Sequence, residues 1–219
     1  MYTIILNTVL LLGILPLTFQ LIKSRKLWVN DAVTPFVWLT AIATCYEFFG
    51  TSLLRIDSKY WFHLYPLLSF LALYIFFSKT LSSNYSKIMK IGLVLFFINY
   101  TVSFFYIESS AFVSVSINRL YVSIFVFIFS VIWFKDAFDK LNKSFLFKEI
   151  DIHYLWDSEN FYFVAGVLLY YATTFFLFLS SNLLFESNLY FNDFWVVNVI
   201  ATLVLRVFLI ISVWKMKKA

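Results

Sequence analysis

Three charged side chains lie deep inside long apolar stretches of this sequence: Glu47, Arg119 and Arg206. A charged group in the hydrocarbon of a membrane costs at least a few kcal/mol, so such groups normally face one another inside a helical bundle. One carboxylate and two guanidinium groups can form a structural ion pair that fixes helix register. They can also bind an anion, because one positive charge remains after the pairing.

Polar residues recur at helical spacing around these charges, which places them on one face of each helix. Thr40 and Thr44 precede Glu47, and Asn198 and Thr202 precede Arg206. One interpretation is that these stripes hold the bundle together by hydrogen bonds between helices. The other is that they line a binding site. The candidate site or buried charge cluster comprises Glu47, Arg119, Arg206, His63, Asn99, Asn118, Tyr170 and Asn198.

Glu47 is the only acidic residue within the apolar stretches. We expect its carboxylate to lie within hydrogen-bonding distance of Arg119 or Arg206, with Tyr or Asn groups around it. The excess of positive charge can then be relieved by a carboxylate ligand, a lipid headgroup or water. All these groups are expected in the half of the bundle that faces the outside of the cell.

The residue inventory excludes several kinds of intramembrane chemistry. The last apolar stretch has no lysine for a retinal Schiff base, and the chain has only two histidines, His63 and His153, for a zinc site. No aspartate lies within a stretch, and Glu47 alone cannot form a proton relay. Cys45 is the single cysteine, so no disulfide forms within the chain. We therefore expect no catalytic residue, no metal, no cofactor and no enzyme activity.

The elements that must position the charges are continuous apolar runs, each about as long as a bilayer-spanning helix. Apolar residues make up 62% of the 219 residues and charged residues 13%, against about 45–50% and about 25% in soluble domains. This composition excludes a soluble enzyme, a disordered chain and a nucleic-acid binder. The sequence predicts a single all-α transmembrane domain with spans at about 2–22, 32–54, 60–77, 88–107, 111–134, 161–185 and 194–214.

Most of the 17 lysine and arginine residues follow the first, third, fifth and seventh runs. The positive-inside rule then places the N-terminus outside and the C-terminus in the cytoplasm, with the chain in the inner (plasma) membrane of a bacterium. Tryptophans near the run ends predict belts at the membrane surface rather than a ligand cage. These are Trp28, Trp61, Trp133, Trp195 and Trp214.

The segment 135–160 departs from the pattern of short connections. Its apolar residues continue at helical spacing after Phe134, with charged residues between them, which predicts a cytoplasmic, interfacial continuation of the fifth helix. The segment is either a connector on the lipid headgroups or a docking surface for a membrane or cytoplasmic protein partner. Membrane lipids are the other expected partners, and nucleic acid is not one.

Three short motifs resemble those of small uncharacterised seven-helix inner-membrane proteins of Bacteroidota. They are Tyr46-Glu47-Phe48, His63-Leu64-Tyr65, and Tyr170-Tyr171 with Phe175-Phe176. Such proteins are similar to the membrane sensor regions of bacterial histidine kinases. The resemblance implies a receptor- or sensor-like module that binds a small molecule or lipid in the outer half of the bundle. An accessory subunit of a larger membrane complex and a small-solute transporter are the alternatives.

Overall fold

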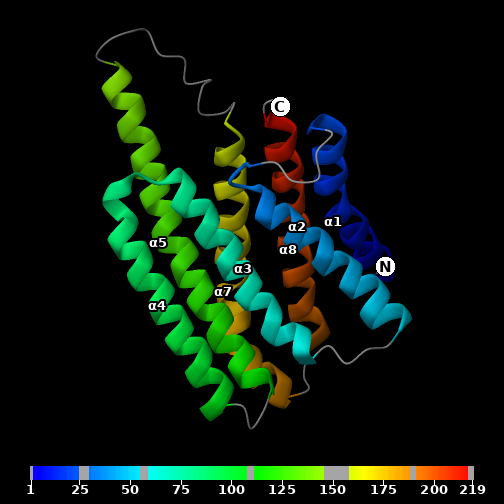
Figure 1. Cartoon of the computed structure of the whole chain (residues 1–219). Coiled ribbons are helices and arrows are strands. Elements are labelled where there is room, and N and C mark those ends of the chain that lie inside the picture. Colours follow the sequence, from blue (N-terminus) through cyan, green and yellow to red (C-terminus); the bar gives the residue numbers. More distant parts are fainter. Residues whose placement is uncertain are drawn as a thin grey trace.

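The computed structural model of the chain describes residues 2–24, 30–54, 59–107, 111–145, 158–187 and 191–216. All regular structure in these residues is helical (Figure 1). The α-helices are α1 (Tyr2–Ser24), α2 (Thr34–Cys45), α3 (Lys59–Thr80), α4 (Ser86–Val102), α5 (Ala111–Phe145), α7 (Glu159–Ser187) and α8 (Phe191–Lys215). Two π-helices continue α2 and α4, namely η1 (Tyr46–Leu53) and η3 (Ser103–Ile107), and a short 3-10 helix, η2 (Ser83–Tyr85), precedes α4.

Each apolar run of the sequence coincides with a helical segment. The bounds differ from the predicted ones by a few residues, except that α5 continues well beyond 134 to Phe145. The helical continuation expected from the spacing after Phe134 is therefore present. The remainder of the expected interfacial segment, 146–157, lies outside the described residues.

Four helical segments in the described part of the chain are long and apolar enough to cross a membrane. They are Ser83–Tyr106, Ile117–Lys140, Glu159–Leu177 and Val196–Lys215. A shorter apolar helix, Leu10–Lys23, lies within α1. Consecutive helices run in opposite directions through the bundle, as short connections require (Figure 1).

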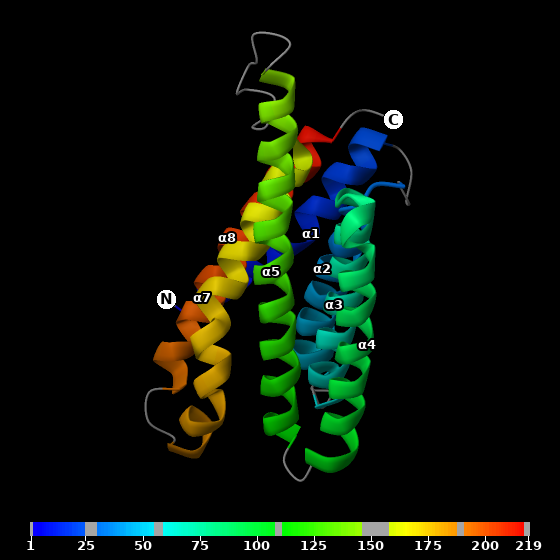
Figure 2. The ribbon, with the colours of Figure 1, turned by 90° about the vertical axis from the view of Figure 1, so that its left-hand side faces the viewer.

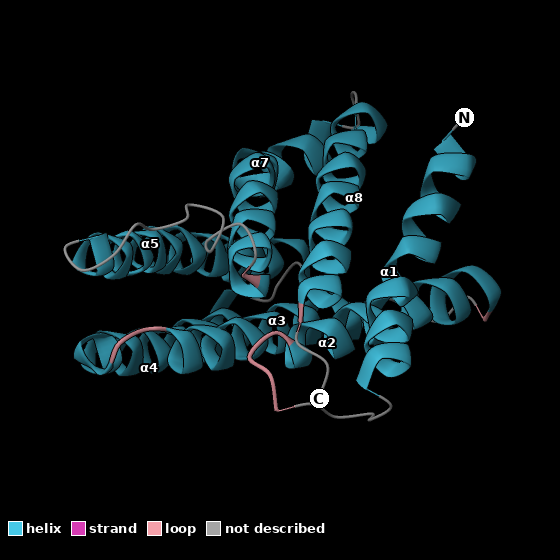
Figure 3. Cartoon of the chain, turned by 90° about the horizontal axis from the view of Figure 1, so that it is seen from above, coloured by secondary structure: helices cyan, strands magenta, loops and turns pink. Residues whose placement is uncertain are grey.

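Six of the helices form a closed ring, seen from above in Figure 3. Around it, α1 packs on α2, α2 on α3, α3 on α5, α5 on α7, and α7 on α8, which returns to α1. The most extensive pairing joins α7 to α8, where Gly166 permits a close approach, because a Cβ there would lie 2.6 Å from Phe208 Cβ. Across the ring, Phe36 of α2 meets Phe163 of α7 edge-on, with ring centroids 5.3 Å apart.

Helix α4 lies outside this ring, where its main contacts are with α3 and α5. Its described residues bury only Met89 and Phe96. Most of its apolar side chains therefore face outward, as they do on a helix that meets lipid. Tyr106 of η3 is likewise 85% exposed.

Aromatic rings fill much of the core between α3, α5 and α7. Phe70 stacks on Phe96 with ring centroids 3.8 Å apart, and Phe125 meets Phe70 edge-on at 4.8 Å. Phe76 packs on Phe163 at 4.3 Å. Large aromatic side chains thus do the packing that small residues do in many membrane bundles.

The two sides of the ring separate toward one end. Figure 2 shows α7 and α8 inclined to α3, α4 and α5, so that they diverge toward the end where the chain passes from α7 to α8. At the opposite end Lys23 donates a hydrogen bond to the carbonyl of Trp214, and Lys79 donates one to Asn30 Oδ1 at 3.0 Å. Basic side chains therefore gather at the end where the helices lie closer together.

Candidate functional site

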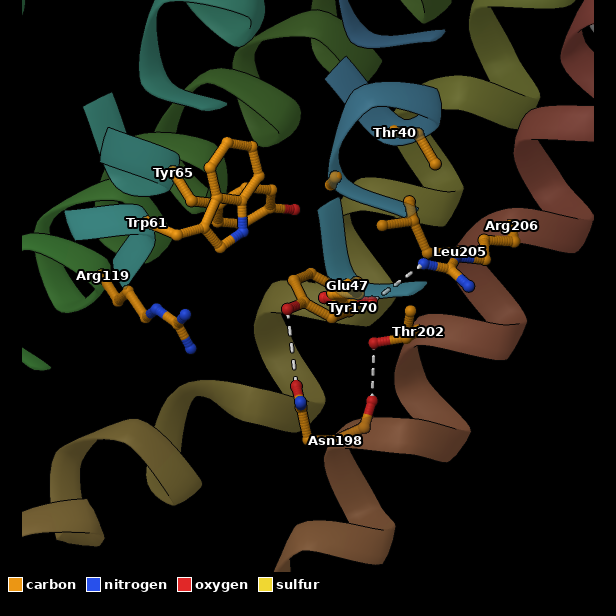
Figure 4. Close-up of a pocket in the computed structure, with 11 residues that line it drawn as sticks. Thr40, Glu47, Trp61, Tyr65, Arg119, Tyr170, Asn198, Thr202, Leu205 and Arg206 are labelled. Carbon is orange, nitrogen blue, oxygen red and sulfur yellow. Dashed lines mark hydrogen bonds and ion pairs between the residues drawn. The ribbon is translucent and has the colours of Figure 1, made fainter. Parts of the chain in front are cut away.

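A cavity of about 100 Å³ lies inside the ring, in the half of the bundle where α7 and α8 diverge from α3 (Figure 4). Its lining comes from α2, η1, α3, α5, α7 and α8. The lining residues are Thr40, Ala43, Glu47, Trp61, Tyr65, Arg119, Tyr170, Asn198, Thr202, Leu205 and Arg206. All three charged residues that the sequence places inside apolar runs thus surround one space.

Helical spacing explains how single helices supply several of these groups. Asn198, Thr202 and Arg206 are four residues apart on α8 and form one stripe toward the cavity. On the facing side, Thr40 and Ala43 come from α2, and Glu47 follows on η1. The two stripes therefore bring opposite charges toward each other across the space.

Glu47 and Arg206 form an ion pair, with Oε2 and Nη2 3.9 Å apart. This distance exceeds that of a direct hydrogen bond, so these two atoms interact through charge alone. The Glu47 side chain is 49% exposed and that of Arg206 only 5%. Glu47 therefore lies at the mouth of the cavity.

The Arg206 guanidinium is held on its inner side by α1 and α2. Nη2 donates a hydrogen bond to Thr44 Oγ1 at 3.2 Å, and the Thr44 hydroxyl donates to the Thr40 carbonyl at 2.8 Å. Gly13 on α1 lies against both groups, since a Cβ there would be 2.0 Å from Thr44 Oγ1 and 2.9 Å from Arg206 Cζ. Only a glycine lets α1 come this close.

Arg119 reaches the cavity from α5, on the wall opposite Arg206 (Figure 4). Its neighbour Asn118 points elsewhere, because successive residues of an α-helix are about 100° apart. Asn118 accepts a hydrogen bond from Asn99 at 3.0 Å and donates one to Ser103 Oγ at 3.3 Å. This contact joins α5 to α4 and η3, and it fixes the rotation of α5 that aims Arg119 inward.

Three of the predicted site residues therefore lie away from the cavity. Asn99 and Asn118 belong to the contact between α4 and α5. His63 is buried toward η3, with its ring 6.2 Å from that of Phe104, and its carbonyl accepts a hydrogen bond from Tyr100. These residues share the polar character of the site but face different neighbours.

Tyr170 and Asn198 do line the cavity, as a pair from α7 and α8. The Tyr170 hydroxyl donates to Asn198 Oδ1 at 3.4 Å, and the Thr202 hydroxyl donates to the Asn198 carbonyl at 2.7 Å (Figure 4). These groups add neutral hydrogen-bonding capacity between the two guanidinium groups.

An aromatic wall from α3 completes the site. Its residues were not among the site residues predicted from the sequence. Trp61 and Tyr65 line the cavity, and Tyr46 of η1 stacks on the outer face of Trp61 at 4.6 Å with an interplanar angle of 21°. Trp61 near a run end was expected in a surface belt. The spacing of Trp61 and Tyr65 by four residues was the signal that could have identified one common face.

Many hydroxyl groups of the polar stripes donate within their own helix, although Thr44 also accepts a hydrogen bond from Arg206 of another helix. Thr40, Thr44, Ser123, Thr174 and Thr202 each donate to the carbonyl four residues earlier in their own helix. A hydroxyl satisfied in this way needs no partner on another helix. The cross-helix bonds come mainly from amide, phenol and guanidinium groups, whose longer side chains reach further.

The charges of the lining determine which ions the cavity attracts. Two guanidinium groups and one carboxylate give the lining a positive formal charge, which repels a cation and attracts an anion. In the residues that the structure describes, no three His, Cys, Asp or Glu side chains gather where they could hold a metal ion. Comparison of the chain with protein-family models, curated proteins and solved structures finds no match.

Proposed function

We propose that this protein is a non-enzymatic, receptor-like module of a bacterial plasma membrane, which binds a small molecule or lipid in the outer half of a seven-span bundle. The observation that carries the proposal is the cavity lined by Glu47, Arg119 and Arg206. A core built only to hold helices together would be filled there, because protein interiors leave few voids larger than a water molecule. A polar cavity ringed by charges and aromatic rings is typical of ligand sites.

The orientation of the proposed bundle follows from the ends of its helices. Lys23, Lys79 and Lys215 lie near the ends of α1, α3 and α8. Since consecutive helices alternate in direction, these ends share one side, which the positive-inside rule assigns to the cytoplasm. The cavity lies toward the other side, near η1 and the start of α3, and is therefore proposed to face the cell exterior.

The test is to identify what the protein retains when it is purified in mild detergent. Native mass spectrometry of the wild-type protein should detect a bound small molecule or lipid. Ala43→Met introduces a longer side chain into the cavity and should remove that mass. Ala172→Met makes the same change two residues from Tyr170, on a different face of α7, and should retain it.

Two outcomes would contradict the proposal. One is a wild-type protein without any bound molecule, even after incubation with an extract of the membrane in which it was made. The other is equal retention by Ala43→Met and Ala172→Met, which would place the bound molecule outside the cavity.

A role as an accessory subunit of a membrane complex is a second candidate. It is favoured by α4 and η3, which lie outside the ring and present exposed aromatic side chains, among them Phe97, Phe104 and Phe105. The same experiment discriminates the two, because a subunit would co-purify with a second protein in fixed ratio. A transporter, the third candidate, would require the cavity to open alternately to both sides.

A further inference from the structure

Two arginines line the cavity, from α8 and from α5. Arg206 is nearly fully buried, hydrogen-bonded to Thr44, paired with Glu47 and confined by Gly13. Its charge is balanced by Glu47, and its position is fixed by two other helices. Arg206 therefore belongs to the wall of the cavity.

Arg119 is the second cation of the lining, and it faces Glu47 and Tyr170 from the opposite wall (Figure 4). Two guanidinium groups and one carboxylate line the cavity, so the lining carries a formal charge of one positive unit. In a water-poor bundle a net charge is costly, and a ligand of opposite charge removes most of that cost. A single negative charge on the ligand balances the site.

The size of the cavity limits what can enter it. A volume of about 100 Å³ is well below the approximately 300–1,000 Å³ of pockets that enclose drug-sized ligands. It accommodates a compact group such as a carboxylate or a phosphodiester, while the rest of the molecule extends toward the mouth. The lining also includes Tyr65 and Trp61, and the ring of Tyr46 stacks on that of Trp61. Such rings favour a planar or apolar body.

On these grounds, and resting on the proposed function, we infer that the ligand is an organic monoanion. Its oxyanion group is bound by Arg119, and its body lies against Trp61 and Tyr65. A guanidinium group binds a carboxylate or phosphodiester through two parallel N–H···O bonds, a geometry that lysine cannot reproduce. A free carboxylate and the phosphodiester of an anionic lipid share this chemistry.

Benzoate is a suitable probe because it combines one carboxylate with one planar ring. The purified protein in an uncharged detergent is titrated with benzoate, and with benzyl alcohol as the neutral analogue of the same shape. Binding is followed by tryptophan fluorescence and by the melting temperature. Benzoate should raise the melting temperature and change the fluorescence, and benzyl alcohol should do neither. A second arm compares phosphatidylglycerol with phosphatidylcholine in mixed micelles, which distinguishes a free carboxylate from a lipid headgroup as the source.

Variants of single residues assign the contacts. Arg119→Gln should weaken binding of the responding anion at least about tenfold, the loss expected for a charge-assisted hydrogen bond. Arg119→Lys should restore only part of it. Lys87→Gln removes the same charge from an exposed position on α4 and should leave affinity unchanged. In Trp61→Phe the fluorescence change should disappear while the rise in melting temperature remains.

The inference is overturned if neither benzoate nor phosphatidylglycerol binds, or if Arg119→Gln and Lys87→Gln affect affinity equally. It is also overturned if the molecule lost from Ala43→Met is neutral or cationic. That last result would leave the proposed function standing, because the cavity would still hold a ligand. A wild-type protein that retains no molecule and binds neither probe would overturn both the inference and the proposed function.

Discussion

At the scale of single residues, the most demanding contact is the one between Gly13, Thr44 and Arg206. Three helices meet there, and the guanidinium group occupies the space that a side chain on residue 13 would need. The hydroxyl of Thr44 serves as acceptor to Arg206 and donor to the backbone of its own helix, so both of its hydrogen-bonding roles are used. The contact therefore couples the packing of α1 to the placement of a cavity cation.

Gly13→Ala should destabilise the protein, because its Cβ would lie 2.0 Å from Thr44 Oγ1 and 2.9 Å from Arg206 Cζ. Overpacking of this kind costs about 1–3 kcal/mol. The melting temperature in detergent measures the effect. Gly92→Ala is the matched control, since the nearest atom to its Cβ would be 3.4 Å away, an ordinary contact. Equal melting temperatures for the two variants would show that α1 does not lie against Arg206 as described.

Glu47→Gln should lower stability and leave anion binding intact. Loss of the carboxylate leaves Arg206 buried without its counter-charge, but Glu47 is 49% exposed, so water and salt already weaken the pair. We expect a cost of about 1–2 kcal/mol rather than the roughly 3–5 kcal/mol of a fully buried pair. The control is Glu159→Gln at the start of α7. Affinity for a responding anion should be equal or higher in Glu47→Gln, because the cavity becomes more positive.

A fall in anion affinity in Glu47→Gln, with unchanged stability, would contradict this view of the residue. It would assign Glu47 to the ligand rather than to Arg206.

At the scale of elements, the two π-helices set the outer ends of α2 and α4. In η1 the backbone N–H of Leu54 bonds to the carbonyl of Phe49, five residues back. Each π turn takes up more residues than an α turn, so side chains beyond Cys45 rotate relative to the α-helical stripe. Glu47 follows the change of register, which helps to explain its place at the mouth.

The polar contact between α4 and α5 should be what holds the peripheral helix. Asn118→Ala removes hydrogen bonds of 3.0 and 3.3 Å to Asn99 and Ser103, each worth about 0.6–2 kcal/mol inside a membrane. Hydrogen–deuterium exchange should rise across α4 and η3 and change little in α7 and α8. Asn84→Ala, at an exposed position of η2, should change neither region. A uniform rise over the whole bundle would mean that α4 is not a separately held element.

Helix positions could be predicted from the sequence because long apolar runs leave few alternatives. The convergence of Glu47, Arg119 and Arg206 could also be predicted, since burying charges apart is costly. The assignment of His63, Asn99 and Asn118 to the same site could not, because a polar stripe does not identify the helix that it faces. That choice depends on how the helices are ordered around the bundle.

The π-helical hydrogen bonding of η1 could likewise not be predicted from the sequence. The choice between α and π hydrogen bonding over Tyr46–Leu53 depends on packing against α3, where Tyr46 stacks on Trp61. A tryptophan near the end of an apolar run resembles a member of a membrane-surface belt until the side chain that stacks on it is known.

At the scale of the whole molecule, the ring of six helices determines which helix movements reach the cavity. Because α1 packs on both α2 and α8, the first and last helices together close the cavity on the side of Arg206. By contrast, α4 contacts mainly α3 and α5, so its loss or movement leaves the ring continuous. The cavity and the peripheral helix are thus separable parts of one bundle.

The proposed topology predicts where reporters will work. A reporter fused after the last residue should be active only if it functions in the cytoplasm, and the same holds for one inserted after Ser82, between α3 and α4. A reporter inserted after Leu54 should require an extracytoplasmic location, because η1 ends on the opposite side. Activity of the C-terminal fusion outside the cytoplasm would reverse the orientation and place the cavity on the inner side of the membrane.

The closure of the ring by α8 also has a consequence for biogenesis. Ribosomes release the chain from the N-terminus, so Glu47 and Thr44 enter the membrane while Arg206 is still unsynthesised. During that interval the place of the Arg206 guanidinium group beside Gly13 is vacant. The Glu47 carboxylate also lacks the ion pair that it forms in the finished bundle. The cavity cannot be complete until α8 has been inserted, because α8 supplies part of its lining. A truncated or stalled product without α8 would expose an acidic, incompletely packed surface to the membrane, where quality-control proteases can recognise it.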